Sequence, residues 1–287
     1  MKNFSKSIVG AFLFTVLLGL FSCEQEEVKP KPAKAQTTVD ADLDNLVYLQ
    51  HYLIKQNSAT LEYDVDHHLQ KYKMTPNTYV QYDWYTENNS MYLSSKRYIG
   101  GKLNKKVVYS LNSSNKAIKS LTTLYALNGA VVKTEIHGFE YNSSTGKLKK
   151  IYNPDPNIKE TTTFNYNSSG DIVNITYHHV PGGIKIINDY WYTNTDFPSP
   201  KIDKYHFNAE IENLDFYPAI FGSFSKHLPM RTRNIKVVNN NLTQAYRKYK
   251  YAFDQKGYVT NRKIMKASDN SLISSDDFEY LVVPVVM

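Results

Sequence analysis

The stretch Phe139-Glu140-Tyr141-Asn142-Ser143-Ser144-Thr145-Gly146-Lys147-Leu148-Lys149-Lys150-Ile151 indicates how this chain folds. It begins with an aromatic-x-aromatic pair, continues through a polar turn that contains a glycine, and ends in alternating apolar residues. Alternate residues of a strand point to the same face, so the two rings share one face of a sheet. Asparagine and glycine readily adopt the positive φ that hairpin turns require. The stretch therefore predicts a β-hairpin with one apolar face.

The same pattern recurs along the chain. Residues 164–175 and 249–259 repeat it, and looser copies begin at Tyr63, Tyr109 and Tyr125. Tyr141 and Tyr166 lie 25 residues apart, and Tyr166 and Tyr192 lie 26 residues apart, which suits two strands in each repeat. The chain holds 24 Tyr and 13 Phe, and aromatic residues favour strands. We predict an all-β fold, an antiparallel meander of about 12 to 16 strands that curls into an open or closed barrel-like sheet.

One segment interrupts the repeats. Leu214, Tyr217, Phe221 and Phe224 have roughly helical spacing, while nearby prolines allow only a short helix. We therefore expect a short helix or loop insertion near 208–230. Its expected role is to fill one end of the curled sheet, with a lid over a binding site as the alternative.

The N-terminus predicts an export signal. The chain is apolar from Ile8 to Phe21 and basic just before that run. Such a run is shorter than the roughly 20 residues that a spanning helix needs, but it fits the apolar region of a signal peptide. The ending Leu20-Phe21-Ser22-Cys23 resembles the lipobox of bacterial lipoproteins. That resemblance implies cleavage between Ser22 and Cys23 and a lipid, with palmitate among its acyl chains, on Cys23.

The residues after the cysteine refine the predicted location. Glu24, Glu26 and Glu27 form an acidic cluster that resembles the surface-export tag of some lipoproteins, and a solvated tether is the alternative. The resemblance implies the outer membrane of a Gram-negative bacterium, with the protein facing the cell exterior. The expected organisation is a signal peptide at 1–22, an anchor and disordered tether at 23–41, and a single β-rich domain at 42–287.

The repeats, taken with the segment 216–229, resemble a bacterial lipoprotein family. That family contains a domain of unknown function described as having a porin-like fold, and the repeats also distantly resemble YD-type (Rhs-like) repeats. The resemblance implies a porin-like fold and carries no activity. A membrane barrel needs an outward apolar band about 25 Å tall, whereas the positions that alternate with the aromatic residues carry Lys, Asn and Thr. An outer-membrane pore is therefore disfavoured.

The sequence predicts no catalytic residue, metal site or cofactor. His67-His68 and His178-His179 are adjacent pairs, and adjacent strand residues point to opposite faces, so neither pair can chelate one metal ion. The acid pairs Asp64/Asp66 and Asp276-Asp277 show no spacing that fixes the geometry of hydrolysis. An enzyme is disfavoured, with a hydrolase acting on envelope or host polymers kept as the alternative function.

Aromatic side chains supply the candidate binding residues. Trp84, Tyr85, Trp191 and Tyr192 are candidates for stacking on sugar rings, although each pair also fits one core ring beside one ordinary exposed ring. The net charge is +7 and the basic residues are scattered along the chain, which suggests weak attraction to acidic polysaccharide or lipid headgroups and no nucleic-acid partner. The expected function is a non-enzymatic binding or scaffold module for a glycan or an envelope protein, held to the membrane by its lipid.

Overall fold

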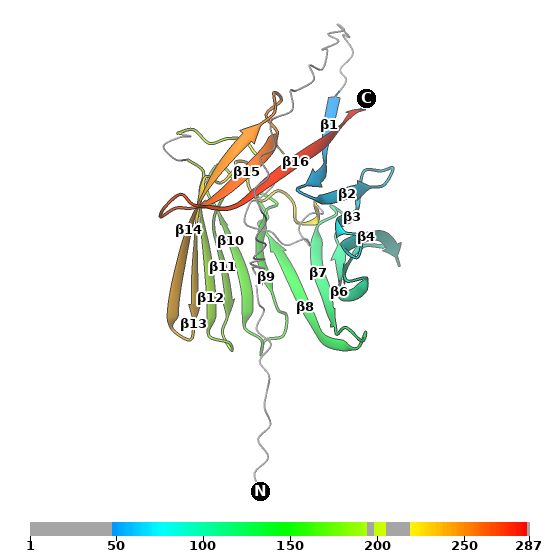
Figure 1. Ribbon diagram of the computed structural model, residues 1–287. Helices are drawn as coiled ribbons and strands as arrows, with labels where there is room; N and C mark the ends of the chain where they lie inside the picture. The colour runs from blue at the N-terminus through cyan, green and yellow to red at the C-terminus, as the bar shows by residue number, and fades with distance from the viewer. Residues whose placement is uncertain (1–47, 194–197, 205–218, 286–287) are drawn as a thin grey trace. The chain divides into compact units, whose positions relative to one another are not determined.

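The computed structural model describes residues 48–193, 198–204 and 219–285, and Figure 1 shows their arrangement. In these ranges, sixteen strands and one short 3-10 helix follow one another. They are β1 (Tyr48–Gln56), β2 (Ala59–Tyr63), β3 (Leu69–Thr75), β4 (Thr78–Glu87), β5 (Ser90–Ile99), β6 (Lys102–Leu111), β7 (Ala117–Tyr125), β8 (Val131–Tyr141), β9 (Leu148–Tyr152), β10 (Glu160–Tyr166), β11 (Ile172–His179), β12 (Ile184–Trp191), η2 (Ala219–Phe221), β13 (Arg231–Val238), β14 (Asn241–Phe253), β15 (Val259–Lys266) and β16 (Leu272–Val285).

The strands form a closed antiparallel barrel in which each strand lies beside its sequence neighbours and β1 lies beside β16. Asn57, just after β1, contributes to the closure. Its backbone N–H donates to the carbonyl of Asp277 (2.8 Å), and its side-chain oxygen accepts the Asp277 N–H (2.7 Å). The barrel belongs to a compact unit of residues 51–282. The other unit, 1–50 with 283–287, is described only where β1 begins and β16 ends.

The antiparallel order gives the barrel two ends. One end carries the turns at 64–68, 112–116, 142–147, 167–171 and 254–258, and we call it the tyrosine end. Its turns follow the predicted chemistry: Gly146 and Gly170 have φ of 65° and 84°, a conformation that glycine adopts without strain. The opposite end carries the turns at 100–101, 126–130, 153–159, 180–183 and 239–240.

A ladder of tyrosine hydroxyls explains the aromatic repeat. In two copies of the motif, the second aromatic residue ends its strand and donates its hydroxyl to the carbonyl at the beginning of the preceding strand. Tyr141 donates to Ala117 (2.8 Å) and Tyr166 to Leu148 (2.8 Å). Four further tyrosines donate their hydroxyls to backbone carbonyls in or next to the preceding strand. We call the six residues the tyrosine ladder: Tyr63, Tyr141, Tyr166, Tyr192, Tyr251 and Tyr280. Each bond ties neighbouring strands together where their backbone pairing stops.

Residues 219–230, the plug, fill the tyrosine end of the barrel. Phe221 packs edge-on against Tyr109 (5.6 Å between ring centroids), and Phe224 lies 5.7 Å from Phe164. Leu228 and Met230 are fully buried. Because Tyr109 and Phe164 face these plug side chains, we call their side of the sheet the inner face.

The structure confirms the all-β meander and shows that the sheet closes. It confirms the predicted insertion from residue 219 onward as one turn of 3-10 helix followed by irregular chain that packs as a plug; residues 205–218 lie outside the described part. The predicted anchor residues Ser22, Cys23, Glu24, Glu26 and Glu27 also lie outside it. No helix among the described residues is long and apolar enough to cross a bilayer.

Candidate functional site

The outer face of β4 and β5 carries a set of aromatic and polar side chains, which we call the tyrosine strip. The pairing of β4 with β5 sets Tyr79 opposite Tyr98 and Tyr85 opposite Tyr92. The first pair stacks with ring centroids 4.6 Å apart and the second with centroids 5.4 Å apart. Tyr79 and Tyr85 are six residues apart on one strand, which corresponds to about 20 Å. The strip therefore presents two flat aromatic surfaces on one side of a hairpin.

Polar groups fill the space between the two tyrosine pairs. Lys96 Nζ lies 2.9 Å from Asp83 Oδ2, and Gln81 donates to Asp83 Oδ1 at 2.7 Å. The hydrogen bond to Asp83 is the main cause that raises the pKa of Lys96, which keeps this lysine charged. Burial, followed by the nearby Glu87 carboxylate, raises the pKa of the Tyr85 hydroxyl, which therefore stays a hydrogen-bond donor. The strip combines ring faces with charged and neutral donors.

The four predicted aromatic residues do not come together. Tyr85 is 39% exposed on the outer face of β4, and Trp191 is 42% exposed on the outer face of β12. Trp84 packs against the core, and Tyr192 is buried, with its hydroxyl 2.7 Å from Ser225 Oγ. Only Tyr85 belongs to the tyrosine strip. Tyr79, Tyr92 and Tyr98 were missed because a strand pairing, not a sequence motif, brings them together.

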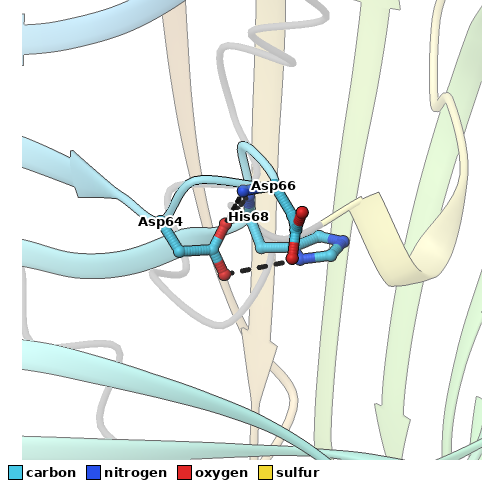
Figure 2. A group of neighbouring side chains, drawn as sticks. All are labelled: Asp64, Asp66 and His68. Carbon is cyan, nitrogen blue, oxygen red and sulfur yellow. Dashed lines mark hydrogen bonds and ion pairs between the residues drawn. The ribbon is translucent and has the colours of Figure 1, made fainter.

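Asp64, Asp66 and His68 come close together in the turn between β2 and β3, with side-chain ligand atoms within 4.8 Å of one another (Figure 2). The carboxylate of Asp64 accepts hydrogen bonds from the backbone of its own turn, which gives it a structural role. Its Oδ1 accepts the backbone N–H groups of Asp66 (3.0 Å) and His68 (2.8 Å). Asp254 makes the same pair of contacts in the turn before β15. Both acids thus act as Asx-turn residues, a common role of Asp in turns.

Apart from the Asp64/Asp66 pair, the predicted histidine and acid pairs are dispersed. His178 and His179 point to opposite faces of β11, as their partners Thr161 and Glu160 do on β10. His67 lies in a turn, not on a strand as expected, and stacks on Tyr52 (4.6 Å). Asp276 faces inward and pairs with Arg262 (2.7 Å), whereas Asp277 accepts from Asn261. Asp276 and Asp277 therefore do not form two facing carboxylates.

An inner-face cluster that sequence reasoning missed surrounds Glu160. His137 Nε2 lies 3.9 Å from Glu160 Oε2, and the Tyr177 hydroxyl donates to Glu160 Oε1 at 2.8 Å. His137, together with Tyr177, outweighs burial and lowers the pKa of Glu160. Glu135, on β8, is buried and pairs with Lys133. Glu160 and Glu135 therefore each have a basic partner. The one signal in the sequence that could have revealed this cluster is the alternation of its residues along strands that lie far apart in the chain.

Rows of polar residues cross the outer face of the barrel, and an apolar row of Val108, Leu121 and Ile136 crosses β6–β8 on the same face. One row of neighbouring residues crosses β3 to β6, and other rows cross β8–β9, β11–β13 and β14–β15. The row across β3 to β6 consists of Lys71, Gln81, Lys96 and Lys106. The row across β8–β9 consists of Glu140 and Lys150, and the row across β14–β15 consists of Lys250 and Lys263. The row across β11–β13 consists of Asn174, Asp189 and Arg233.

Comparisons with known proteins find likenesses among solved structures. A scan against protein-family models finds no match, and a search of the curated proteins finds none either. Among solved structures, a porin-like protein from Bacteroides uniformis ATCC 8492 is similar with a TM-score of 0.48 and 14% identity, over 82% of this chain and 95% of that chain. A porin-like protein from Bacteroides vulgatus ATCC 8482 is similar with a TM-score of 0.44 and 13% identity, over 81% of this chain and 99% of that chain.

Proposed function

We propose that this protein is a lipid-anchored outer-membrane protein whose barrel stands in water and binds a glycan through the tyrosine strip. The observation that carries the proposal is the strip itself. Two stacked tyrosine pairs flank Asp83, Lys96 and Gln81 on an outward face. Tyrosine rings offer rigid apolar surface together with a hydroxyl, and the carboxylate, ammonium and amide offer hydrogen bonds that sugar hydroxyls can complete.

The row of lysines on the outer face supports a barrel that stands outside the bilayer. A Lys or Arg that faces lipid at the bilayer midplane costs about 2–4 kcal/mol in a membrane barrel. Here Lys71, Lys96 and Lys106 lie in one row of outward positions on neighbouring strands. The proposed lipid on Cys23 supplies the attachment that such a barrel lacks. Glu24, Glu26 and Glu27 then serve as the proposed signal for display on the cell surface.

Binding of the purified protein to a panel of host and bacterial glycans tests the strip. The double variant Tyr79→Ala/Tyr85→Ala removes one ring from each stacked pair and should weaken binding by roughly tenfold or more, because each aromatic contact contributes about 0.5–1.5 kcal/mol. Tyr246→Ala, which removes an exposed ring from β14, is the matched control and should bind as the wild type does. Equal binding by the double variant, or binding to no glycan of the panel, would overturn the proposal.

Metabolic labelling with a fatty acid tests the anchor separately. Cys23→Ala should abolish the label and release the protein from membranes, because no other cysteine is available for lipidation. Replacement of Glu24, Glu26 and Glu27 by Ala should reduce digestion by protease added to intact cells. Persistent labelling of Cys23→Ala would show that the lipobox interpretation is wrong.

A further inference from the structure

The sheet gathers basic residues that are scattered in the sequence. Arg231 on β13 lies directly opposite Lys248 on β14, and Lys250 on β14 lies directly opposite Lys263 on β15. All four share the outer face, because Thr232 and Tyr249, which alternate with Arg231 and with the two β14 lysines, are buried on the inner face. We call Arg231, Lys248, Lys250 and Lys263 the cationic patch.

Like charges directly opposite each other on neighbouring strands destabilise a sheet. Elsewhere on the outer face the chain compensates for this repulsion: Lys96 lies opposite Lys106, and Asp83 sits 2.9 Å from Lys96. In the described part of the chain, no acidic side chain pairs with any member of the cationic patch; the polar contact of Lys248 is to the amide of Asn270 (3.1 Å). The patch therefore carries two uncompensated like-charge pairs.

An exposed aromatic residue borders the patch. Trp191 is 42% exposed, and the guanidinium carbon of Arg231 lies 6.0 Å from the centre of its ring. Arg233 approaches the same ring at 5.9 Å, but its charge is paired with Asp189. This cation–π contact holds the guanidinium of Arg231 beside the tryptophan. Its planar fork matches a carboxylate or sulfate group with two parallel hydrogen bonds.

We propose that the cationic patch binds an acidic polysaccharide. Neighbouring strands are about 4.8 Å apart and alternate residues about 6.6 Å apart along a strand, so the four cations form an extended array and not one compact pocket. An extended array suits a polymer that repeats a carboxylate or sulfate along its length. The choice of a polysaccharide among such polymers rests on the proposed location at the cell surface. The patch is separate from the tyrosine strip, which lies on β4 and β5.

The purified protein is tested for binding to polygalacturonate, with neutral dextran as the uncharged polymer. The wild type should bind polygalacturonate, and binding should weaken as salt rises from about 50 to about 300 mM, because exposed charges are screened. Lys250→Gln/Lys263→Gln should weaken binding by roughly tenfold through the loss of two exposed ion pairs. Lys102→Gln/Lys119→Gln, which removes the same charge from exposed positions on β6 and β7, should bind as the wild type does.

Thermal unfolding of the same variants shows whether each is folded. Lys250→Gln/Lys263→Gln should unfold at the same or a higher temperature than the wild type, since it removes one like-charge pair. The variant Tyr79→Ala/Tyr85→Ala should keep its binding to polygalacturonate, which separates a failure of this inference from a failure of the tyrosine strip. Equal binding by both lysine variants, no binding by the wild type, or tighter binding to phosphatidylglycerol vesicles than to the polymer would overturn the proposal.

Discussion

At the scale of single residues, the tyrosine ladder shows how one side chain serves two purposes. The ring of Tyr166 packs against the core, and its hydroxyl donates to the carbonyl of Leu148. We expect Tyr166→Phe to lower the free energy of unfolding by about 1–2 kcal/mol, because a partly buried carbonyl loses its donor while the packing is retained. Denaturant unfolding measures this difference. Tyr152→Phe, on the outer face, is the control and should change stability by less than about 0.5 kcal/mol; equal losses would contradict the ladder.

Glu160 provides a residue-scale prediction about acid. Its pKa is lowered by His137 and Tyr177 against the opposing effect of burial. A carboxyl with a lowered pKa in the folded state contributes stability above its unfolded pKa, and that contribution is lost as pH falls through the folded value. Between about pH 5 and about pH 3, the wild type should therefore lose more stability than Glu160→Gln does. Denaturant midpoints across this range give the comparison, and parallel curves for the two proteins would contradict it.

At the scale of elements, Asp171 fastens the plug to the turn before β11. Its Oδ1 accepts the backbone N–H groups of Lys226 (2.8 Å) and His227 (2.9 Å), and its Oδ2 lies 2.8 Å from His227 Nδ1. Asp171→Ala should lower the free energy of unfolding by about 3 kcal/mol, because two N–H groups lose their acceptor and each loss costs about 1–3 kcal/mol. Trypsin should also cleave after Lys226 faster than in the wild type. Asp269→Ala, which alters an exposed turn, is the control; unchanged cleavage in Asp171→Ala would show that the plug is held by its apolar packing alone.

At the scale of the whole molecule, the sequence predicts the individual hairpins well, but it predicts poorly how their strands pair with one another. Aromatic-x-aromatic pairs and Asn/Gly turns are local signals, and they lead to the meander. The spacing of Phe221 and Phe224 and the nearby prolines are also local, and they lead to the insertion. Closure of the barrel depends on contacts such as that of Asn57 with Asp277, which no local sequence pattern predicts. The tyrosine strip and the cationic patch arise from register, because a shift by one residue would move every side chain to the other face. Register between strands cannot be read from one chain's composition or spacing.

The buried tyrosines also make the stability of the whole molecule depend on alkaline pH. Burial raises the pKa of the Tyr141, Tyr166, Tyr177 and Tyr192 hydroxyls. The folded state keeps these protons where unfolded tyrosines, with a pKa of about 10, release them. Their contribution is therefore complete below about pH 10 and falls above it by about 1.4 kcal/mol per pH unit for each tyrosine. Burial lowers the pKa of Lys147, which acts in the opposite direction, but this single contribution opposes those of the four tyrosines.

Two measurements test this pH dependence. Denaturant midpoints should fall above about pH 10, and tyrosinate absorbance should show buried tyrosines that ionise only as the protein unfolds. A midpoint that stays constant to about pH 11 would contradict this, and Tyr166→Phe should show a shallower decline than the wild type.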